Sequence, residues 1–458
     1  MDKNNNILVK LARKIGMDGA IAYSSGARIV QGVTGVLSIF FISTFLTGVE
    51  QGFYFTFGSI LALQVFFELG LTGILTQYTA HEMSHLKVDS NYTISGERRY
   101  LSRLASLVQF CIKWYTIIAV IALVVLAIVG FVYFTYFNKD NEGVSWFAPW
   151  LLICVGTAIK LFQSPFNSIL MGMGRVKEMS KIAFYQQLVI PITSWIGLFL
   201  GLKLYVLGIG YVLSVALWVL MVWLDSSYIL LFKLIKYKTI ERIDYIKEIF
   251  PYQWRMAISG FSGYFIFQLF NPVLFATEGA VIAGQMGMTQ QVLNAIQTFS
   301  FSWINTKVPL YSNLIAKQQY KKLDSIFNIT LKQMVSICFV LLTTFFFVIW
   351  ILNETGMRMG GNMLSDRFLG YIPTLFMMAP VFLHQFINSW ATYLRCHKRE
   401  PFLVYSACNA IACAFSTLCF GKMFGLYGVT IGYFVISLLF FPWGYRIFIN
   451  KKQEWHNE

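Results

Sequence analysis

Residues 108–137 read VQFCIKWYTIIAVIALVVLAIVGFVYFTYF and contain one charged side chain, Lys113. A helix needs about 20 apolar residues to cross the roughly 30 Å hydrocarbon core of a bilayer, so this stretch predicts a transmembrane helix. Eleven further apolar stretches follow the same pattern. In chain order the twelve stretches cover 21–46, 51–80, 108–137, 146–171, 182–202, 206–228, 257–277, 279–306, 326–352, 368–394, 402–421 and 425–447.

The composition of the 458-residue chain agrees with this pattern. Hydrophobic residues make up 57% of it and charged residues only 12%, whereas about a quarter of the residues in a soluble domain are charged. We therefore predict an all-α integral membrane protein with twelve transmembrane helices.

The formal charge of +15 is distributed unevenly along the chain. Of the 36 Lys and Arg residues, 26 fall on one set of alternating loops and tails. The opposite connections carry five, at Lys139, Lys203, Arg358, Arg367 and Lys422. Basic residues remain preferentially on the cytoplasmic side during insertion, which predicts that both termini are cytoplasmic. The positive charge thus reflects topology, and we expect no nucleic-acid partner.

Two halves of six helices each are predicted from the position of the most polar segment and from weak internal similarity. LYVLGIGY (204–211) resembles LYGVTIGY (426–433). Because six is an even number, both halves enter the membrane from the same side, so the lobes should be related by a parallel pseudo-twofold axis, as in transporters built from parallel repeats. The predicted units are a cytoplasmic amphipathic segment 1–20, an N-terminal lobe 21–228, a cytoplasmic linker 229–256, a C-terminal lobe 257–447 and a cytoplasmic tail 448–458.

Charged side chains at membrane depth cost about 2.5–3.5 kcal/mol on insertion scales and therefore need a reason. The candidate cations for binding a pyrophosphate are Arg28, Lys160, Lys113 and Lys332. Lys113 and Lys332 lie near the predicted cytoplasmic helix ends, where they could instead extend toward the interface. Arg28 and Lys160 lie deeper in their helices and are the stronger candidates.

Two further titratable residues are candidates for coupling transport to an ion gradient. Glu68 is either a structural counter-ion to a nearby cation or a site that responds to protons or Na⁺. His384 is either a packing histidine or a titrating switch. No bound cofactor is expected, and the coupling ion, Na⁺ or H⁺, is left open.

Uncharged amides form the other polar group. Gln290, Asn294 and Gln297 recur at i, i+4 and i+7 on one helix face. Such residues either bond one helix to another or line a hydrated cavity that suits sugar hydroxyls. The candidate glycan-binding residues are Gln31, Gln290, Asn294, Gln297 and Asn388. We find no catalytic residues, metal-ligand cluster or nucleotide-binding loop in the sequence, so an enzyme is not expected.

Two segments carry a resemblance to a known family. EQGFYFTFGSILALQVFFELGL (50–71) and FNPVLFATEGAVIAGQMGMTQQVLNAIQ (270–297) resemble the bacterial polysaccharide and O-antigen flippases of the multidrug/oligosaccharidyl-lipid/polysaccharide (MOP) exporter superfamily. The chain is similar, more distantly, to the lipid II flippases, whose first helix carries cavity arginines in the region comparable to Arg28.

The resemblance implies a two-lobed transporter with the fold of the multidrug exporters and lipid II flippases, in the bacterial cytoplasmic (inner) membrane. It implies that the protein moves undecaprenyl-pyrophosphate-linked oligosaccharides outward by alternating access, for surface polysaccharide or O-antigen synthesis. The expected partners are that glycolipid and membrane lipids, and a polysaccharide polymerase and a chain-length regulator are further candidates. A cation-coupled exporter of drugs or metabolites is the alternative, followed by a membrane glycan polymerase or ligase, which the short outer loops oppose.

Overall fold

The computed structural model describes residues 19–68, 70–89, 92–138, 143–359, 362–397 and 399–457. The predicted amphipathic segment 1–20 lies almost wholly outside these residues, and of Arg28 only the backbone is described. The helices of the first half are α2 (Gly19–Phe45), α3 (Gly48–Leu61), η1 (Ala62–Gln64), α4 (Val65–Glu68), α5 (Leu71–Met83), α6 (Arg98–Phe137), α7 (Phe147–Gly172), α8 (Val176–Phe199) and α9 (Tyr205–Leu224).

The linker region and the second half follow in the same way. Their helices are α10 (Tyr228–Lys236), the π-helix η2 (Tyr245–Ile249), α11 (Phe250–Phe267), α12 (Phe270–Glu278), α13 (Ala280–Ala316), α14 (Tyr320–Thr355), η3 (Ser365–Arg367), α15 (Tyr371–Arg395) and α16 (Leu403–Asn457). Two short antiparallel hairpins complete the description, β1 (Leu86–Val88) with β2 (Ile94–Gly96), and β3 (Arg358–Met359) with β4 (Asn362–Met363).

The predicted all-α membrane fold is confirmed, and helices occupy all twelve predicted stretches. Two stretches are broken within the membrane. The second runs through α3, η1, α4 and α5 and bends at Gly70, whose φ of 66° suits glycine; the seventh consists of α11 and α12. The last two stretches form α16, which kinks at Gly425 (φ 55°).

Length and composition support a multi-pass membrane protein. Seven of the described helices are long and apolar enough to cross a bilayer, or eight if the bent pair from Gly48 to Met83 counts as one span. α13 and α15 are not among them, because polar side chains interrupt their apolar sequence. Large apolar side chains face outward along α6, including Ile117, Val120 and Ile128, which are 54–57% exposed. Lipid tails are the solvent that suits such a surface.

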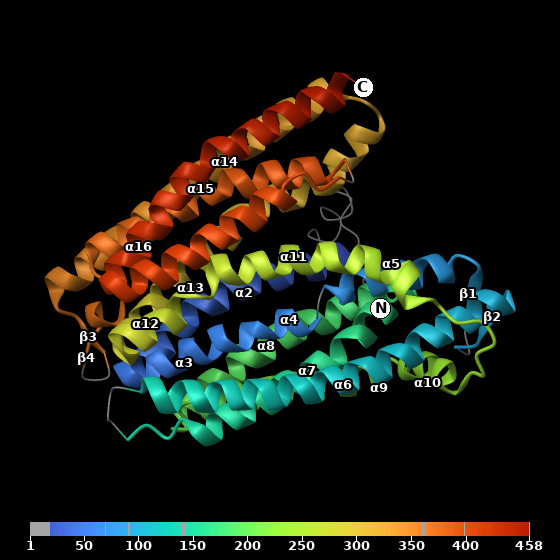
Figure 1. Cartoon of the computed structure of the whole chain (residues 1–458), viewed down its shortest axis with the longest axis horizontal. Coiled ribbons are helices and arrows are strands. Elements are labelled where there is room, and N and C mark those ends of the chain that lie inside the picture. Colours follow the sequence, from blue (N-terminus) through green and yellow to red (C-terminus); the bar gives the residue numbers. More distant parts are fainter. Residues whose placement is uncertain are drawn as a thin grey trace, which may run out of the picture.

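The helices form two lobes arranged as a V (Figure 1). In one lobe α2 packs on α8, and α7 packs on α6 and α9; in the other, α15 packs on α14 and α16. The lobes meet near the α2–α3 turn and β3–β4, which we call the closed end. They diverge toward β1–β2, α10 and the last turns of α16, which we call the open end. The lobe boundaries 21–228 and 257–447 stay a prediction, because α11 packs on α4 and α5 as well as on α16.

The lobes approach each other most closely where α3 crosses α13 near the closed end. A Cβ atom added to Gly52 would lie 2.0 Å from the carbonyl oxygen of Ala280, and one added to Gly284 would lie 2.9 Å from the Gly52 nitrogen. Only glycine permits two helix backbones to touch in this way. Beside this crossing, Phe53 of α3 meets Phe275 of α12 with ring centroids 5.0 Å apart. The two lobes are therefore in direct contact at this crossing.

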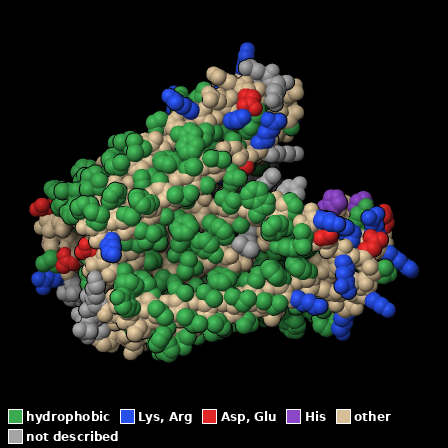
Figure 2. All heavy atoms as spheres, in the orientation of Figure 1, with side chains coloured by type: hydrophobic (Ala, Val, Ile, Leu, Met, Phe, Trp, Pro, Cys, Tyr) green, Lys and Arg blue, Asp and Glu red, His purple; other side chains and the backbone are tan. Residues whose placement is uncertain are grey.

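Charge is concentrated at the other end of the molecule. Figure 2 shows Lys and Arg side chains gathered mainly at the open end, with apolar side chains covering the middle of this face. The surface is also hollowed between the lobes at the open end. This separation of charged ends from an apolar middle is what a bilayer imposes on a spanning protein.

The linker between the halves is attached to the N-terminal lobe. Ser102 of α6 accepts the N–H groups of Ile240 and Glu241 at 2.7 and 2.9 Å. Arg103 donates to Glu248 at 2.5 Å and to Glu82 of α5 at 3.2 Å. Burial by itself would raise the pKa of Glu248, but the hydrogen bond from Arg103 and one from the Asp244 N–H lower it overall.

Candidate functional site

A cavity of about 400 Å³ lies between the lobes, adjacent to the glycine crossing. Residues of α2, α3, α12 and α13 form most of its wall. Its volume lies within the range of roughly 300–1,000 Å³ that is typical of small-molecule sites. Among the described residues, six amide side chains line the cavity: Gln31, Gln268, Asn271, Gln290, Gln291 and Asn294. Amide side chains from both halves of the chain therefore line the same cavity.

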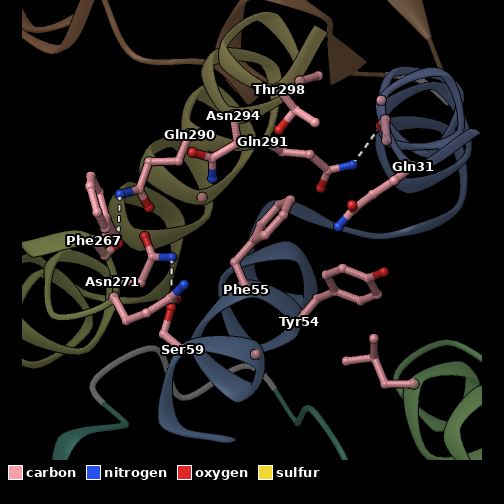
Figure 3. Close-up of a pocket in the computed structure, with 17 residues that line it drawn as sticks. Gln31, Tyr54, Phe55, Ser59, Phe267, Asn271, Gln290, Gln291, Asn294 and Thr298 are labelled. Carbon is pink, nitrogen blue, oxygen red and sulfur yellow. Dashed lines mark hydrogen bonds between the residues drawn. The ribbon is translucent and has the colours of Figure 1, made fainter. Parts of the chain in front are cut away.

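Two of these amides, Asn271 and Gln291, form hydrogen bonds across the lobe boundary (Figure 3). Asn271 of α12 donates to the hydroxyl of Ser59 on α3 at 3.0 Å, and Gln291 of α13 donates to the Gly35 carbonyl of α2 at 2.6 Å. Asn271 is only 5% exposed, and its Oδ1 atom has no hydrogen-bond partner among the described residues. A buried acceptor without a partner costs about 1–3 kcal/mol, so a donor that reached this atom would stabilise it.

The described part of the cavity wall carries amide groups and no charged side chain. Of the described residues that line it, none is Asp, Glu, Lys, Arg or His. Tyr54 and Phe55 of α3 and Phe267 of α11 supply aromatic surface beside the amides (Figure 3). Amides offer both donors and acceptors, and each hydroxyl offers the same two functions. The chemistry of this wall thus matches an uncharged polyol better than a free ion.

Three of the five residues predicted to bind glycan lie in this wall, namely Gln31, Gln290 and Asn294. Gln290 also donates to the Phe267 carbonyl at 3.3 Å. Gln297 is not among the described lining residues; its backbone carbonyl accepts a hydrogen bond from Gln385 at 3.2 Å. Asn388 is half-buried on α15 and also lies outside the described wall.

The predicted cations are placed differently. Lys160 is half-buried on α7, and its Nζ atom lies 4.6 Å from the centroid of the Tyr211 ring on α9. Tyr211 is one turn beyond Leu207, which lines the cavity, so Lys160 is near the wall without forming part of it. Arg28 precedes Gln31 by three residues, or about 4.5 Å along α2, on the side toward the open end.

Lys113 and Lys332 are exposed and do not line the cavity. Lys113 instead borders a separate pocket of about 230 Å³, with Arg242 of the linker. The described structure brings the amides together but does not bring Lys160, Lys113 and Lys332 into one cluster. Their role in binding pyrophosphate stays a prediction.

The two candidate coupling residues also lie outside the described wall. Glu68 is half-buried at the end of α4 and accepts a hydrogen bond from the Thr72 hydroxyl at 2.5 Å. His384 is buried on α15; its Nδ1 atom lies 3.1 Å from the Tyr433 hydroxyl, and its ring meets Phe267 at 5.7 Å. Because Phe267 lines the cavity, His384 sits directly behind the wall.

Asn271, Gln268 and Gln291 are also amides within or beside predicted apolar stretches, but the sequence does not assign them to a site. It gave no signal for Ser59 or Tyr54, since single hydroxyl and tyrosine side chains are common in membrane helices. Only the packing of α3 against α12 and α13 brings them to the cavity.

The chain resembles known proteins in its fold and not in its sequence. No family model matches the sequence, and no curated protein matches it. Among solved structures, an inward-facing multidrug resistance MATE family transporter of the MOP superfamily matches with a TM-score of 0.67 and 13% identity, over 92% of this chain and 96% of that one. The lipid II flippase MurJ in an inward closed conformation matches with a TM-score of 0.60 and 12% identity, over 94% of this chain and 90% of that one.

The fold of this chain is therefore similar to that of these MATE and MurJ structures. An outward-facing MATE family transporter of the superfamily matches with a TM-score of 0.56 and 14% identity, over 95% of this chain and 97% of that one. At identities this low the structural matches show the fold alone, and the cargo has to be argued from the cavity.

Proposed function

We propose that this protein is a flippase that moves a lipid-linked oligosaccharide across the cytoplasmic membrane by alternating access. The observation that carries the proposal is the amide wall of the cavity between the lobes. Gln31, Gln290 and Asn294, from both halves of the chain, line one space, and Asn271, whose buried acceptor has no partner among the described residues, lies in the same wall. A glycan supplies hydroxyls for each of these groups.

The open end is the cytoplasmic end in this proposal, because most basic residues gather there. A glycan headgroup enters from that side and binds among the amides. Its pyrophosphate then lies toward the open end, near Arg28 and Lys160, where a cation offsets the phosphate charge. The polyprenyl tail remains in lipid. Glu68 and His384 are proposed to respond to Na⁺ or H⁺ and so to couple the cycle to an ion gradient.

A cation-coupled drug or metabolite exporter is the second candidate, because the MATE family transporters share the fold. An exporter of organic cations needs an acid at the binding site, and no Asp or Glu lines the cavity among the described residues. The uncharged wall favours the glycan over this alternative.

The test is a deletion strain complemented with the cavity triple variant Asn271→Leu, Gln290→Leu and Asn294→Leu at native expression levels. Leu keeps the approximate size of an amide side chain but removes its hydrogen bonds. We expect lipid-linked repeat units to accumulate on the cytoplasmic face and surface glycan to fall strongly. Gln333→Leu is the matched control, since Gln333 is exposed on α14.

Full surface glycan in the triple variant would refute the cavity assignment. Drug hypersensitivity of the deletion strain with intact surface glycan would instead establish the exporter, and glycan extension by the purified protein would establish an enzyme. For the pyrophosphate contacts, Arg28→Ala and Lys160→Ala should insert normally and lose translocation. Lys321→Ala, at an exposed position of α14, is their control.

A further inference from the structure

The closed end contains a buried arginine that the sequence placed in a loop. Arg367 belongs to η3, just before α15, and is only 3% exposed. Its Nη2 atom donates to the carbonyl oxygens of Ser43 at 3.2 Å and Leu46 at 2.6 Å, and Nη1 donates to the side-chain oxygen of Gln51 at 3.4 Å. All three acceptors belong to the N-terminal half, whereas Arg367 belongs to the C-terminal half.

The two carbonyl acceptors have a particular electrostatic character. α2 ends at Phe45, so the carbonyls of Ser43 and Leu46 are at the negative end of the helix, where intrahelical donors run out. A guanidinium keeps its charge and donates in a planar fork. Arg367 therefore caps the C-terminus of α2 from the opposite lobe. Asp366 and Glu50 are the acids that face it.

Gln51 makes a second crossing contact at the same place. It is 1% exposed, and its Nε2 atom donates to the Gly284 carbonyl at 2.9 Å and to the Arg367 carbonyl at 3.1 Å. Gln51 thus bridges α3 to both α13 and η3. Its neighbour Gly52 allows this by letting the helix backbones touch.

We propose that Arg367 and Gln51 form a latch that holds the closed end shut, and that releasing it is the step that opens the cavity to the extracytoplasmic side. The inference rests on the proposed alternating access. Parting the lobes breaks all the bonds of the latch together, because each joins one lobe to the other. Once apart, the guanidinium and the α2 carbonyls both reach water, so the latch is reversible.

The alternative is that Arg367 only stabilises the folded protein and does not control opening of the closed end. The two readings differ in what a latch variant does to the cavity. A latch variant remains folded and admits a reagent from the closed end, whereas a folding variant exposes the core of each lobe. Native Cys154 and Cys413 report on the lobe cores, since both are buried.

The test uses Gly58→Cys as a reporter of cavity access in right-side-out vesicles without substrate. Gly58 lines the cavity, and a Cβ added there meets no atom within 4 Å. A membrane-impermeant maleimide is added outside, and protein with its native cysteines alone gives the background. We expect Arg367→Ala and Gln51→Ala to raise the Gly58→Cys labelling rate by about tenfold, the size of effect expected from losing a hydrogen bond to a charged group.

Arg358→Ala is the matched control, because Arg358 is exposed in β3 at the same end; its labelling rate should not change. Unchanged labelling in both latch variants would overturn the proposal, as would labelling of Cys154 and Cys413 in both. If Arg367→Ala alone unfolds, Arg367→Lys and Gln51→Ala decide the question. Labelling needs no glycan, so its result stands whether or not the proposed cargo is correct.

Discussion

Replacing Gly52 by alanine should favour separation of the two lobes at the closed end. The added Cβ would lie 2.0 Å from the Ala280 oxygen, 2.5 Å from its carbonyl carbon and 2.8 Å from its Cα. All three atoms are backbone, so no side-chain rotation relieves the overlap. Carbon–oxygen contacts settle at about 3.3 Å, which means that α3 and α13 must separate by roughly 1.3 Å.

The energetic effect follows from this overlap. Overpacking of a close contact costs about 1–3 kcal/mol, and here the cost falls only on the conformation in which the closed end is shut. Alanine also favours the helix by about 1 kcal/mol over glycine, but that gain applies equally to every conformation. The equilibrium should therefore move toward opening of the closed end by a factor of about 5–150.

A disulfide between Gly48→Cys and Val281→Cys measures this shift. A Cβ on Gly48 would lie 3.8 Å from both methyl groups of Val281, across the lobe boundary. We expect the initial rate of oxidative cross-linking to fall at least fivefold when Gly52→Ala is added. Gly58→Ala is the control, because it makes the same change in the same helix and its Cβ meets nothing within 4 Å.

Equal cross-linking rates in Gly52→Ala and Gly58→Ala, with both proteins folded, would refute this reasoning. That result would mean that the lobes accommodate the extra methyl group without separating, so the glycine contact would not set the position of the closed end.

Two further predictions concern stability and the linker. A Cβ on Gly130 would lie 2.0 Å from the Trp150 ring, so Gly130→Ala should lower the free energy of unfolding by about 1–3 kcal/mol. The purified variant should lose its monodisperse peak in size-exclusion chromatography at a lower temperature. Gly263→Ala is the control and should not change that temperature, because a Cβ on Gly263 meets nothing within 4 Å. Glu248→Gln should loosen the linker, seen as faster proteolysis, because the bond with Arg103 loses its charge. Since the pKa of Glu248 is lowered overall, this attachment is complete above the ordinary glutamate range near pH 4.3 and should be lost only as the pH falls through the depressed pKa.

The sequence predicted the helices well because length and apolarity are local properties. The stretches 108–137 and 146–171 correspond closely to the membrane parts of α6 and α7. The breaks were harder to predict. Pro165 lies inside the continuous α7, whereas the second stretch breaks at Gly70. A membrane helix tolerates proline when neighbouring groups satisfy the freed carbonyl, so proline alone does not locate a break.

The site was predictable only in part, because the sequence of a helix does not determine which of its faces is turned toward the cavity. The spacing of Gln290 and Asn294 placed both on one face, and both line the cavity. Lys160 is directed to the Tyr211 ring by the packing of α7 on α9. Arg367 contacts Gln51, 316 positions away in the chain, and no local pattern reveals such a pairing.

The attachment of the linker to α6 and α5 has a consequence for how the two halves can move relative to each other. Ser102 and Arg103 hold residues 240–248 along the flank of one lobe, and the Tyr78 hydroxyl donates to the Glu248 carbonyl. The linker that joins the two halves is thus held along the side of the N-terminal lobe by these hydrogen bonds. If the two halves move relative to each other as proposed, that motion begins after Ile249, where this attachment ends.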